Sequence, residues 1–280
     1  MNQLSHINKP ICRLAILSLV ALFPTLLTAR GNWSVSTSAL LSRGSYTLES
    51  ATETWYLYGG IRYRTEAWSV SANLPFVAQN GDGVTNSGGT FLPSGHHGDS
   101  GADGSHHNDG MMGGAFSDMD MGLGDLYLRG EYRLLRDSGK RPWVGATIKV
   151  KVPTASTAHN FGTGKPDIGG SLALRKRFAD YLTVFEAGRW FLGSPVDVDY
   201  ADPWIFGAGA GRFFDGGRYG VLLYYETYTA ILSGFEPNRQ ISLGLNYRAG
   251  NDLVISLIGS GGLSETSPDY GLSCGMEWTL

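Results

Sequence analysis

Residues 122–152, GLGDLYLRGEYRLLRDSGKRPWVGATIKVKV, show the alternation that decides the fold. Apolar residues alternate with polar or charged ones in both halves of this stretch, and the tetrapeptide DSGK at 137–140 separates the halves. Successive side chains of a β-strand point to opposite faces, so this alternation predicts strands with one apolar and one polar face. We therefore expect two antiparallel strands, at 122–136 and 142–152, joined by a turn.

The two faces of these strands predict a barrel in a membrane. Leucine, valine, isoleucine and alanine predominate on one face, whereas the other face carries charged residues, namely Asp125, Arg129, Glu131, Arg133, Lys149 and Lys151. In a transmembrane barrel the apolar face meets lipid and the polar face meets the interior. A shift of one residue would move the arginines into lipid, at roughly 2–4 kcal/mol each near the midplane. The register of these strands is therefore well determined.

Similar segments recur along the chain. The expected strands are 33–41, 54–64, 67–76, 122–136, 142–152, 166–177, 181–191, 203–214, 219–231, 239–248, 252–261 and 270–280. Each is near the length of about 9–11 residues that a tilted membrane strand needs. Short turns follow every second strand and longer connections follow the others, as in barrels with periplasmic turns and extracellular loops. The sequence thus predicts an all-β fold, a transmembrane antiparallel up-and-down β-barrel of about twelve strands and of outer-membrane type, with both termini in the periplasm.

The aromatic composition agrees with this fold. The chain contains 40 glycines, 14 tyrosines, 12 phenylalanines and 7 tryptophans, which suits an all-β protein. All the tryptophans fall near the ends of expected strands. We expect Trp33, Trp68, Trp143 and Trp278 on the periplasmic side, and Trp55, Trp190 and Trp204 on the outer side. This distribution is typical of the two aromatic girdles that flank the lipid.

The beginning of the chain has the features of a cleavable signal peptide. Lys9 and Arg13 precede an apolar run that ends in small residues before position 30. We therefore expect a signal peptide at 1–29 and a barrel at 30–280. Cleavage would remove two basic residues and no acidic one, changing the formal charge from -3 to -5. An acidic chain without a basic stripe does not favour nucleic acid as a partner, and Cys274 would remain without a second cysteine to pair with.

Four motifs carry a family resemblance. They are GLGDLYL at 122–128, followed by EYRL at 131–134, then KVPT at 151–154 and FGTGKPDIG at 161–169. In order and spacing, residues 122–178 resemble the family of outer-membrane transporters named for the meta-pathway of phenol degradation. The resemblance implies an outer-membrane barrel that moves small hydrophobic or aromatic compounds. The rest of the chain matches that family only as a generic barrel.

The connection at 79–121 is the longest and has an unusual composition. It is rich in histidine, methionine, aspartate and glycine and contains no lysine or arginine. The candidate metal ligands are His96, His97, Asp99, Asp103, His106, His107, Asp109, Met111, Met112, Met119 and Met121. Neutral imidazoles bind Cu(II), Ni(II) and Zn(II), and thioethers favour Cu(I). The pattern predicts an extracellular loop that captures copper, or else zinc or nickel, although the barrel itself requires no cofactor. A solvated low-complexity loop is the alternative.

Charged residues on the inner face of three expected strands form the second candidate site. These lumen-lining candidates are Asp125, Arg129, Glu131, Arg133, Lys149, Lys151, Asp167, Arg175 and Arg177. Six basic side chains against three acidic ones leave a positive local potential. This predicts either a pore wall that favours anions or a lumen filled by mutual salt bridges, and the size of a twelve-stranded barrel is compatible with both.

These features predict an outer-membrane channel or transporter for small molecules and no catalytic site. The expected partners are membrane lipid, an unidentified small-molecule substrate, and the barrel-assembly machinery, which would recognise the C-terminal strand at 270–280. The alternatives are a surface metal-binding barrel without transport and, third, an outer-membrane lipid hydrolase. A hydrolase needs a nucleophile beside a base, and the candidate pair Ser267 and His159 has no other feature in its favour.

Overall fold

The computed structural model describes residues 31–48, 50–81, 84–93, 119–157, 159–195 and 198–280, and the predicted signal peptide at 1–29 lies outside them. Among the described residues, no helix is long and apolar enough to cross a membrane. The strands are β1 (Asn32–Gly44), β2 (Thr52–Arg64), β3 (Trp68–Gln79), β4 (Val84–Ser87), β5 (Thr90–Pro93), β6 (Asp120–Leu123), β7 (Leu126–Leu135), β8 (Trp143–Val152), β9 (Asp167–Phe178), β10 (Tyr181–Phe191), β11 (Trp204–Phe214), β12 (Tyr219–Tyr228), β13 (Arg239–Ala249), β14 (Leu253–Gly262) and β15 (Tyr270–Thr279). A short 3-10 turn, η1 (Asp215–Gly217), joins β11 to β12.

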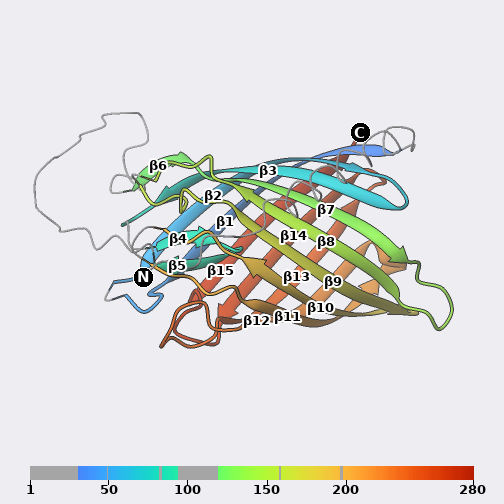
Figure 1. Ribbon diagram of the computed structural model, residues 1–280. Coiled ribbons are helices and arrows are strands. Elements are labelled where there is room, and N and C mark those ends of the chain that lie inside the picture. The colour runs from blue at the N-terminus through green and yellow to red at the C-terminus, as the bar shows by residue number, and fades with distance from the viewer. Residues whose placement is uncertain (1–30, 49, 82–83, 94–118, 158, 196–197) are drawn as a thin grey trace, which may run out of the picture.

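Twelve of these strands close into one antiparallel barrel (Figure 1). The order around the wall follows the chain, from β1 to β3, then from β7 to β15, and β15 pairs with β1. β6 adds to the same sheet by pairing with the end of β3. β4 and β5 form a separate two-stranded sheet. The predicted all-β, twelve-stranded barrel of outer-membrane type is confirmed.

Short and long connections alternate around the barrel, as the sequence predicts. Short turns join β2 to β3, β7 to β8, β9 to β10, β11 to β12 and β13 to β14 at one end, called here the short-turn end. The longer connections, including the one from β3 to β6, lie at the opposite end, called here the long-loop end (Figure 1). β1 begins and β15 finishes at the short-turn end, where Ser34 pairs with Thr279.

The outer face of the barrel is an apolar belt. Leu57, Leu172, Phe185 and Leu223 each expose more than half of their surface on this face. Soluble proteins rarely expose so large an apolar surface, whereas lipid accepts it without penalty. The alternation that predicted the strands therefore separates a face suited to lipid from a face that encloses the interior.

The pairing of β7, β8 and β9 places the charged residues of these strands on the inner face. Arg129 pairs with Lys149, and Lys151 pairs with Asp167, as the predicted register requires. The strand expected at 122–136 is two strands, β6 and β7. Strand pairing is interrupted at Gly124 and Asp125, and the carboxylate of Asp125 makes contacts inside the barrel. β7 also contains a bulge between its residues 133 and 135.

Two expectations about side-chain direction are wrong. Trp143 and Trp190 do not belong to an outer girdle: Trp143 shares the inner face of β8, and Trp190 is 2% exposed and packed against residues inside the mouth. Both rings lie over glycines of the inner wall, which leave the space that a side chain would fill. The ladder of β10 is regular, and Glu186 and Arg189 lie on opposite faces of this strand.

Candidate functional site

A hairpin lies at the long-loop end of the barrel. Its strands, β4 and β5, are joined by Gly88 and Gly89, whose φ angles are 62° and 82°. Positive φ at both central residues is what a two-residue type I′ turn requires, and glycine adopts it at no steric cost. The sequence pattern placed this segment within the long loop at 79–121 and did not predict its strands.

One side of the hairpin packs against the wall formed by β2 and β3. Val84 and Phe91 of the hairpin are buried in an apolar cluster with Tyr56 of β2 and Val77 of β3. Phe161, from the connection between β8 and β9, belongs to the same cluster. Val84 and Val77 are fully buried, so this side of the hairpin excludes water.

The other side of the hairpin packs against β10, β11 and β12. Leu92 is buried with Trp190, Ile205 and Tyr228, one from each of these strands. In a ring of twelve strands, β11 lies opposite β2. The hairpin therefore spans the mouth of the barrel from one wall to the other.

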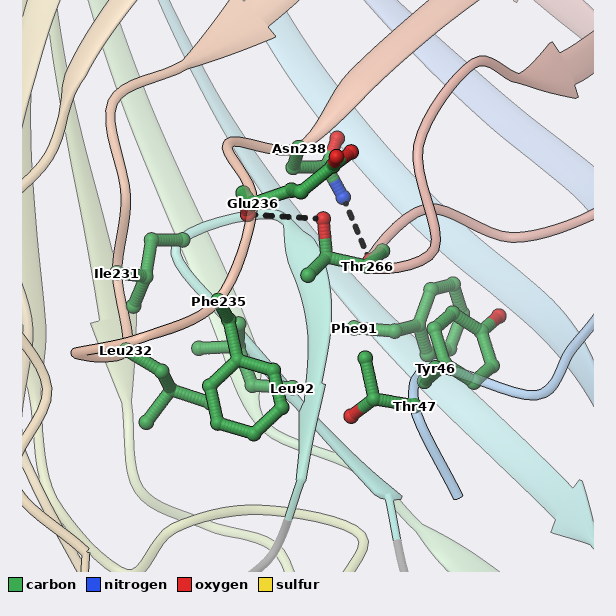
Figure 2. Close-up of a pocket in the computed structure, with 10 residues that line it drawn as sticks. All are labelled: Tyr46, Thr47, Phe91, Leu92, Ile231, Leu232, Phe235, Glu236, Asn238 and Thr266. Atoms are coloured by element: carbon green, nitrogen blue, oxygen red, sulfur yellow. Dashed lines mark hydrogen bonds between the residues drawn. The ribbon is translucent and has the colours of Figure 1, made fainter. Parts of the chain in front are cut away.

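Long loops pack around the hairpin at the mouth (Figure 2). Phe91 lies on one side of a cavity of about 20 Å³, and Leu92 and Phe235 lie on the other side. Such a cavity has room for about one water molecule. Asn238, immediately before β13, donates a hydrogen bond to Oγ1 of Thr90 at 3.0 Å, which connects a third part of the rim to the hairpin.

A buried ion cluster lies beneath the hairpin. Nζ of Lys151 is 3.0 Å from Oδ2 of Asp167 and 3.5 Å from Oδ2 of Asp125, and it donates to Oγ1 of Thr163 at 2.9 Å. Lys151 and Asp167 are both 0% exposed. A buried charge is tolerated only where partners and hydrogen bonds compensate its lost hydration. Here Lys151 lies between two carboxylates and donates a hydrogen bond to Thr163, while Oδ2 of Asp125 accepts no hydrogen bond from the described residues and is compensated by the ion pair alone.

Asp167 connects this cluster to the tip of the hairpin. Its Oδ2 accepts hydrogen bonds from Oγ of Ser87 at 2.9 Å and from the backbone N–H of Gly88 at 3.0 Å. Its Oδ1 accepts a hydrogen bond from the N–H of Gly193, in the loop after β10, at 2.9 Å. One carboxylate thus joins the barrel wall, the hairpin turn and a long loop. Hydrogen bonds to an ionised acceptor are the stronger kind.

Asp125 holds the neighbouring loop in place. Its Oδ1 accepts hydrogen bonds from the backbone N–H groups of Thr154 at 3.0 Å and Ala155 at 2.9 Å. Oγ1 of Thr154 in turn donates to the carbonyl of Gly124 at 3.1 Å. Gly162 lies so close to the carboxylate that a Cβ atom there would collide with it.

Three of the four motifs behind the family resemblance meet in this cluster. Residues 122–128 supply Asp125, and residues 151–154 supply Lys151 and its loop. Residues 161–169 supply Thr163 and Asp167, together with the ring of Phe161 under the hairpin. These motifs therefore form the ion cluster and the apolar contact on which the hairpin packs. Three of the predicted lumen-lining residues, Asp125, Lys151 and Asp167, belong to this cluster.

Four other predicted residues lie further along the inner face. Glu131 is 2.9 Å from Arg129 and 3.6 Å from Arg175, so one carboxylate serves two guanidinium groups. Arg175 stacks on the ring of Trp143 at 4.3 Å. Lys149 lies 5.8 Å from the ring centre of Trp190 and has no ion pair among the described residues. This part of the wall retains an excess of positive charge.

The last two predicted residues lie near the short-turn end. Nε of Arg177 donates to the carbonyl of Ala179 at 2.8 Å, and its guanidinium lies 4.8 Å from the ring centre of Phe213. Arg133 pairs with Gly145 of β8. Neither residue is brought to the ion cluster under the hairpin.

The inner face also has an acidic part, which is not among the predicted site residues. Glu186 of β10 and Glu226 of β12 lie in one cross-strand row, on either side of Gly207 of β11. The ring of Tyr224 covers Gly207, where a Cβ atom would collide with it. Because side chains alternate between the two faces of a strand, the sequence pattern could have placed Glu186 and Glu226 on the inner face.

Most of the candidate metal ligands, namely His96, His97, Asp99, Asp103, His106, His107, Asp109, Met111 and Met112, lie outside the described residues. Met121 is described in β6, where it pairs with Ala78 and is 41% exposed, and Met119 immediately precedes β6. Within the described ranges there is no group of three or more His, Cys, Asp or Glu side chains arranged to hold a metal ion. Metal capture by this loop stays a prediction.

The candidate hydrolase pair has other contacts. Oγ of Ser267 donates to the carbonyl of Arg239 at 2.7 Å and lies 2.8 Å from Oγ of Ser264. The ring of His159 stacks on Phe161, and its Nδ1 is 3.5 Å from Oδ1 of Asp120. These contacts give Ser267 and His159 structural roles in their own loops.

Comparisons with known proteins agree with the architecture. No protein-family model matches the chain, and no curated protein matches it. Among solved structures, it is similar to an outer membrane channel from Pseudomonas putida F1, with a TM-score of 0.62 and 12% identity over 89% of this chain and 96% of that chain. It is also similar to the KdgM porin, with a TM-score of 0.50 and 6% identity over 88% and 99% of the two chains.

These likenesses define the class by its fold, which is that of outer-membrane β-barrels. The resemblance to the family named for the meta-pathway of phenol degradation stays a prediction, since no family model matches.

Proposed function

We propose that the protein is an outer-membrane channel for small solutes, with its long-loop end facing outward and its mouth narrowed by the hairpin β4–β5. The observation that carries this proposal is the hairpin itself, which spans the barrel between β2 and β11 and is held by a buried ion cluster. A barrel that serves only as a structural anchor has no need of such a device. The likeness to outer-membrane channels supports the proposal at the level of the fold.

The inner wall favours small polar or anionic solutes. Lys149 has no ion pair among the described residues, and Arg129 and Arg175 share the single carboxylate of Glu131. Across the lumen, the inner faces of β13 to β15 carry serines, including Ser256 and Ser273. This cationic stretch of the wall attracts anions, and the acidic row on β10 and β12 beside it keeps them from binding so tightly that they cannot leave.

Conductance in planar lipid bilayers tests the hairpin. The variant in which residues 84–93 are replaced by a short glycine-serine linker should give larger single-channel steps than the wild type. As a control, Gly139→Ser in the turn between β7 and β8 should leave the steps unchanged. Equal steps from wild type and hairpin variant, both verified as folded, would mean that the hairpin does not limit the path. No steps from either would indicate a filled barrel and contradict the channel proposal.

Ion selectivity tests the inner wall. Lys149→Glu should shift the reversal potential in a salt gradient toward cation preference, because it replaces an inner cation by an anion. Lys176→Glu is the matched control, since Lys176 lies at the short-turn end and bonds Asp137 and the carbonyl of Gly139. Lys151 is unsuitable for this test because it is fully buried in the ion cluster. An unchanged reversal potential in Lys149→Glu would remove Lys149 from the path.

A further inference from the structure

The outer face of the barrel contains a concavity away from the mouth. Its volume is about 510 Å³, within the range of small-molecule sites, and it lies over β8 to β12. The small side chains of Ala187 and Ala208 lie among the large ones of Phe185, Phe206 and Tyr225. Ala187 pairs with Phe206, and Phe185 pairs with Ala208, so small and large residues alternate diagonally across β10 and β11. The hollow is the gap that the two alanines leave.

A single arginine lies beside this hollow on the lipid-facing side. Arg189 follows Ala187 by two residues on the same face of β10, a distance of about 7 Å along a strand. Its guanidinium lies 5.2 Å from the ring centre of Phe191 and 5.5 Å from that of Trp204. No carboxylate among the described residues pairs with it. An unpaired charge facing lipid is costly unless it reaches an anion at the membrane surface, and a guanidinium matches phosphate in geometry.

We propose that the hollow and Arg189 form a binding site for one phosphate-bearing membrane lipid, with an acyl chain in the hollow and the phosphate on Arg189. The charge of Arg189 and the apolar lining at Ala187, two residues apart on the same face of β10, match the two ends of such a molecule. The site lies on the outside of the barrel, so it is separate from the proposed channel and does not depend on conduction.

Arg212 offers a comparison within the same surface. It also faces outward, over the rings of Tyr181 at 5.2 Å and Phe214 at 5.0 Å. It lies four residues from Ala208, about 13 Å along the strand, toward the short-turn end. Arg212 therefore has the same aromatic setting as Arg189 without the adjacent hollow.

Native mass spectrometry of the full protein, incubated in detergent with phosphatidylglycerol, tests the site. The wild type should retain one lipid molecule. Ala208→Phe, which fills the hollow, should abolish retention, whereas Ala39→Phe on the outer face of β1 should not. Arg189→Gln should weaken retention at least about tenfold, because hydrogen bonds to charged groups are worth at least that factor. Arg212→Gln should have no effect.

Two further measurements make the test decisive. Diacylglycerol, which lacks phosphate, should bind no better to the wild type than to Arg189→Gln. Heat-modifiable migration on SDS gels should show that every variant is folded. The proposal is overturned if the wild type retains no phosphatidylglycerol, if Ala208→Phe retains it as well as the wild type, or if Arg189→Gln and Arg212→Gln behave alike.

Discussion

Lys151 shows how a charged side chain on the inner face of a barrel can serve structure instead of transport. It contacts Asp125, Asp167 and Thr163, and none of these groups is left to a passing solute. Strand alternation placed Lys151 on the inner face correctly, because parity is a local property. Its partners could not be derived in the same way, since Thr163 belongs to a loop whose path depends on the closed barrel.

Removing the lysine should release the hairpin. Lys151→Met leaves two carboxylates buried without a counterion, a change that costs about 3–5 kcal/mol in comparable sites. We expect hydrogen exchange in peptides covering 84–93 to rise steeply, while peptides from β13 stay protected. Lys149→Met, which removes an inner lysine outside the cluster, should leave exchange at 84–93 as in the wild type. Full protection of 84–93 in Lys151→Met would show that the cluster does not hold the hairpin.

Asp137 should titrate below the ordinary range. Hydrogen bonds from Nζ of Lys176 and from the backbone N–H of Arg177 hold the pKa of Asp137 below its usual value, the lysine bond being the larger cause. The folded pKa is thus lower than the unfolded one. The stabilisation is therefore present above the unfolded pKa of about 3.9 and is lost as the pH falls through the folded pKa. NMR of the Asp137 carboxyl carbon should give a midpoint below about 3.9, which Lys176→Met should raise. Identical midpoints in the two proteins would refute this assignment.

At the level of elements, the hairpin was the part hardest to predict. Its strands are four residues each, too short for an alternation pattern to stand out. Two adjacent glycines, Gly88 and Gly89, were the available signal, because a Gly-Gly pair between short β-prone segments is typical of a tight turn. The connection at 79–121 contains many other glycines, so this pair did not stand out as a turn.

The turn glycines should be sensitive to substitution. Gly88→Val places a branched side chain at positive φ, which costs roughly 1–2 kcal/mol, and its Cβ would lie 2.9 Å from Leu192. We expect larger or noisier single-channel steps because the tip no longer fits beside Asp167. Gly139→Val is the matched control, since Gly139 also has positive φ but lies at the short-turn end. If both variants conduct alike, the hairpin turn has no part in setting the conductance.

At the level of the whole molecule, the barrel was predictable because its rule is repeated in every strand. Apolar and polar residues alternate, and short turns alternate with long connections, so an error in one strand is corrected by its neighbours. Trp143 and Trp190 show where the rule gives too little information. Tryptophan near a strand end suggests a girdle, but the glycines that accept these rings inside come from pairings that the sequence does not display.

The outer belt should not tolerate charge. Leu172→Arg puts a guanidinium in the middle of the lipid-facing surface, at a cost of about 2–4 kcal/mol. Ser242→Arg adds the same side chain on the inner face of β13 and should be accepted. Folding into lipid vesicles, followed by heat-modifiable migration, should show a lower folded fraction for Leu172→Arg alone. Equal folding of the two variants would mean that Leu172 does not face lipid.

The place of the hairpin in the chain has an evolutionary consequence. It lies in the connection between β3 and β6, while β3 keeps its own ladder with β2 and β7. Insertions, deletions or exchanges at 84–93 can therefore alter the aperture without breaking a hydrogen bond of the wall. Descendants of this barrel can diverge in what they admit while sharing one assembly pathway. An engineer can graft a foreign peptide at the same place to obtain a pore of new selectivity.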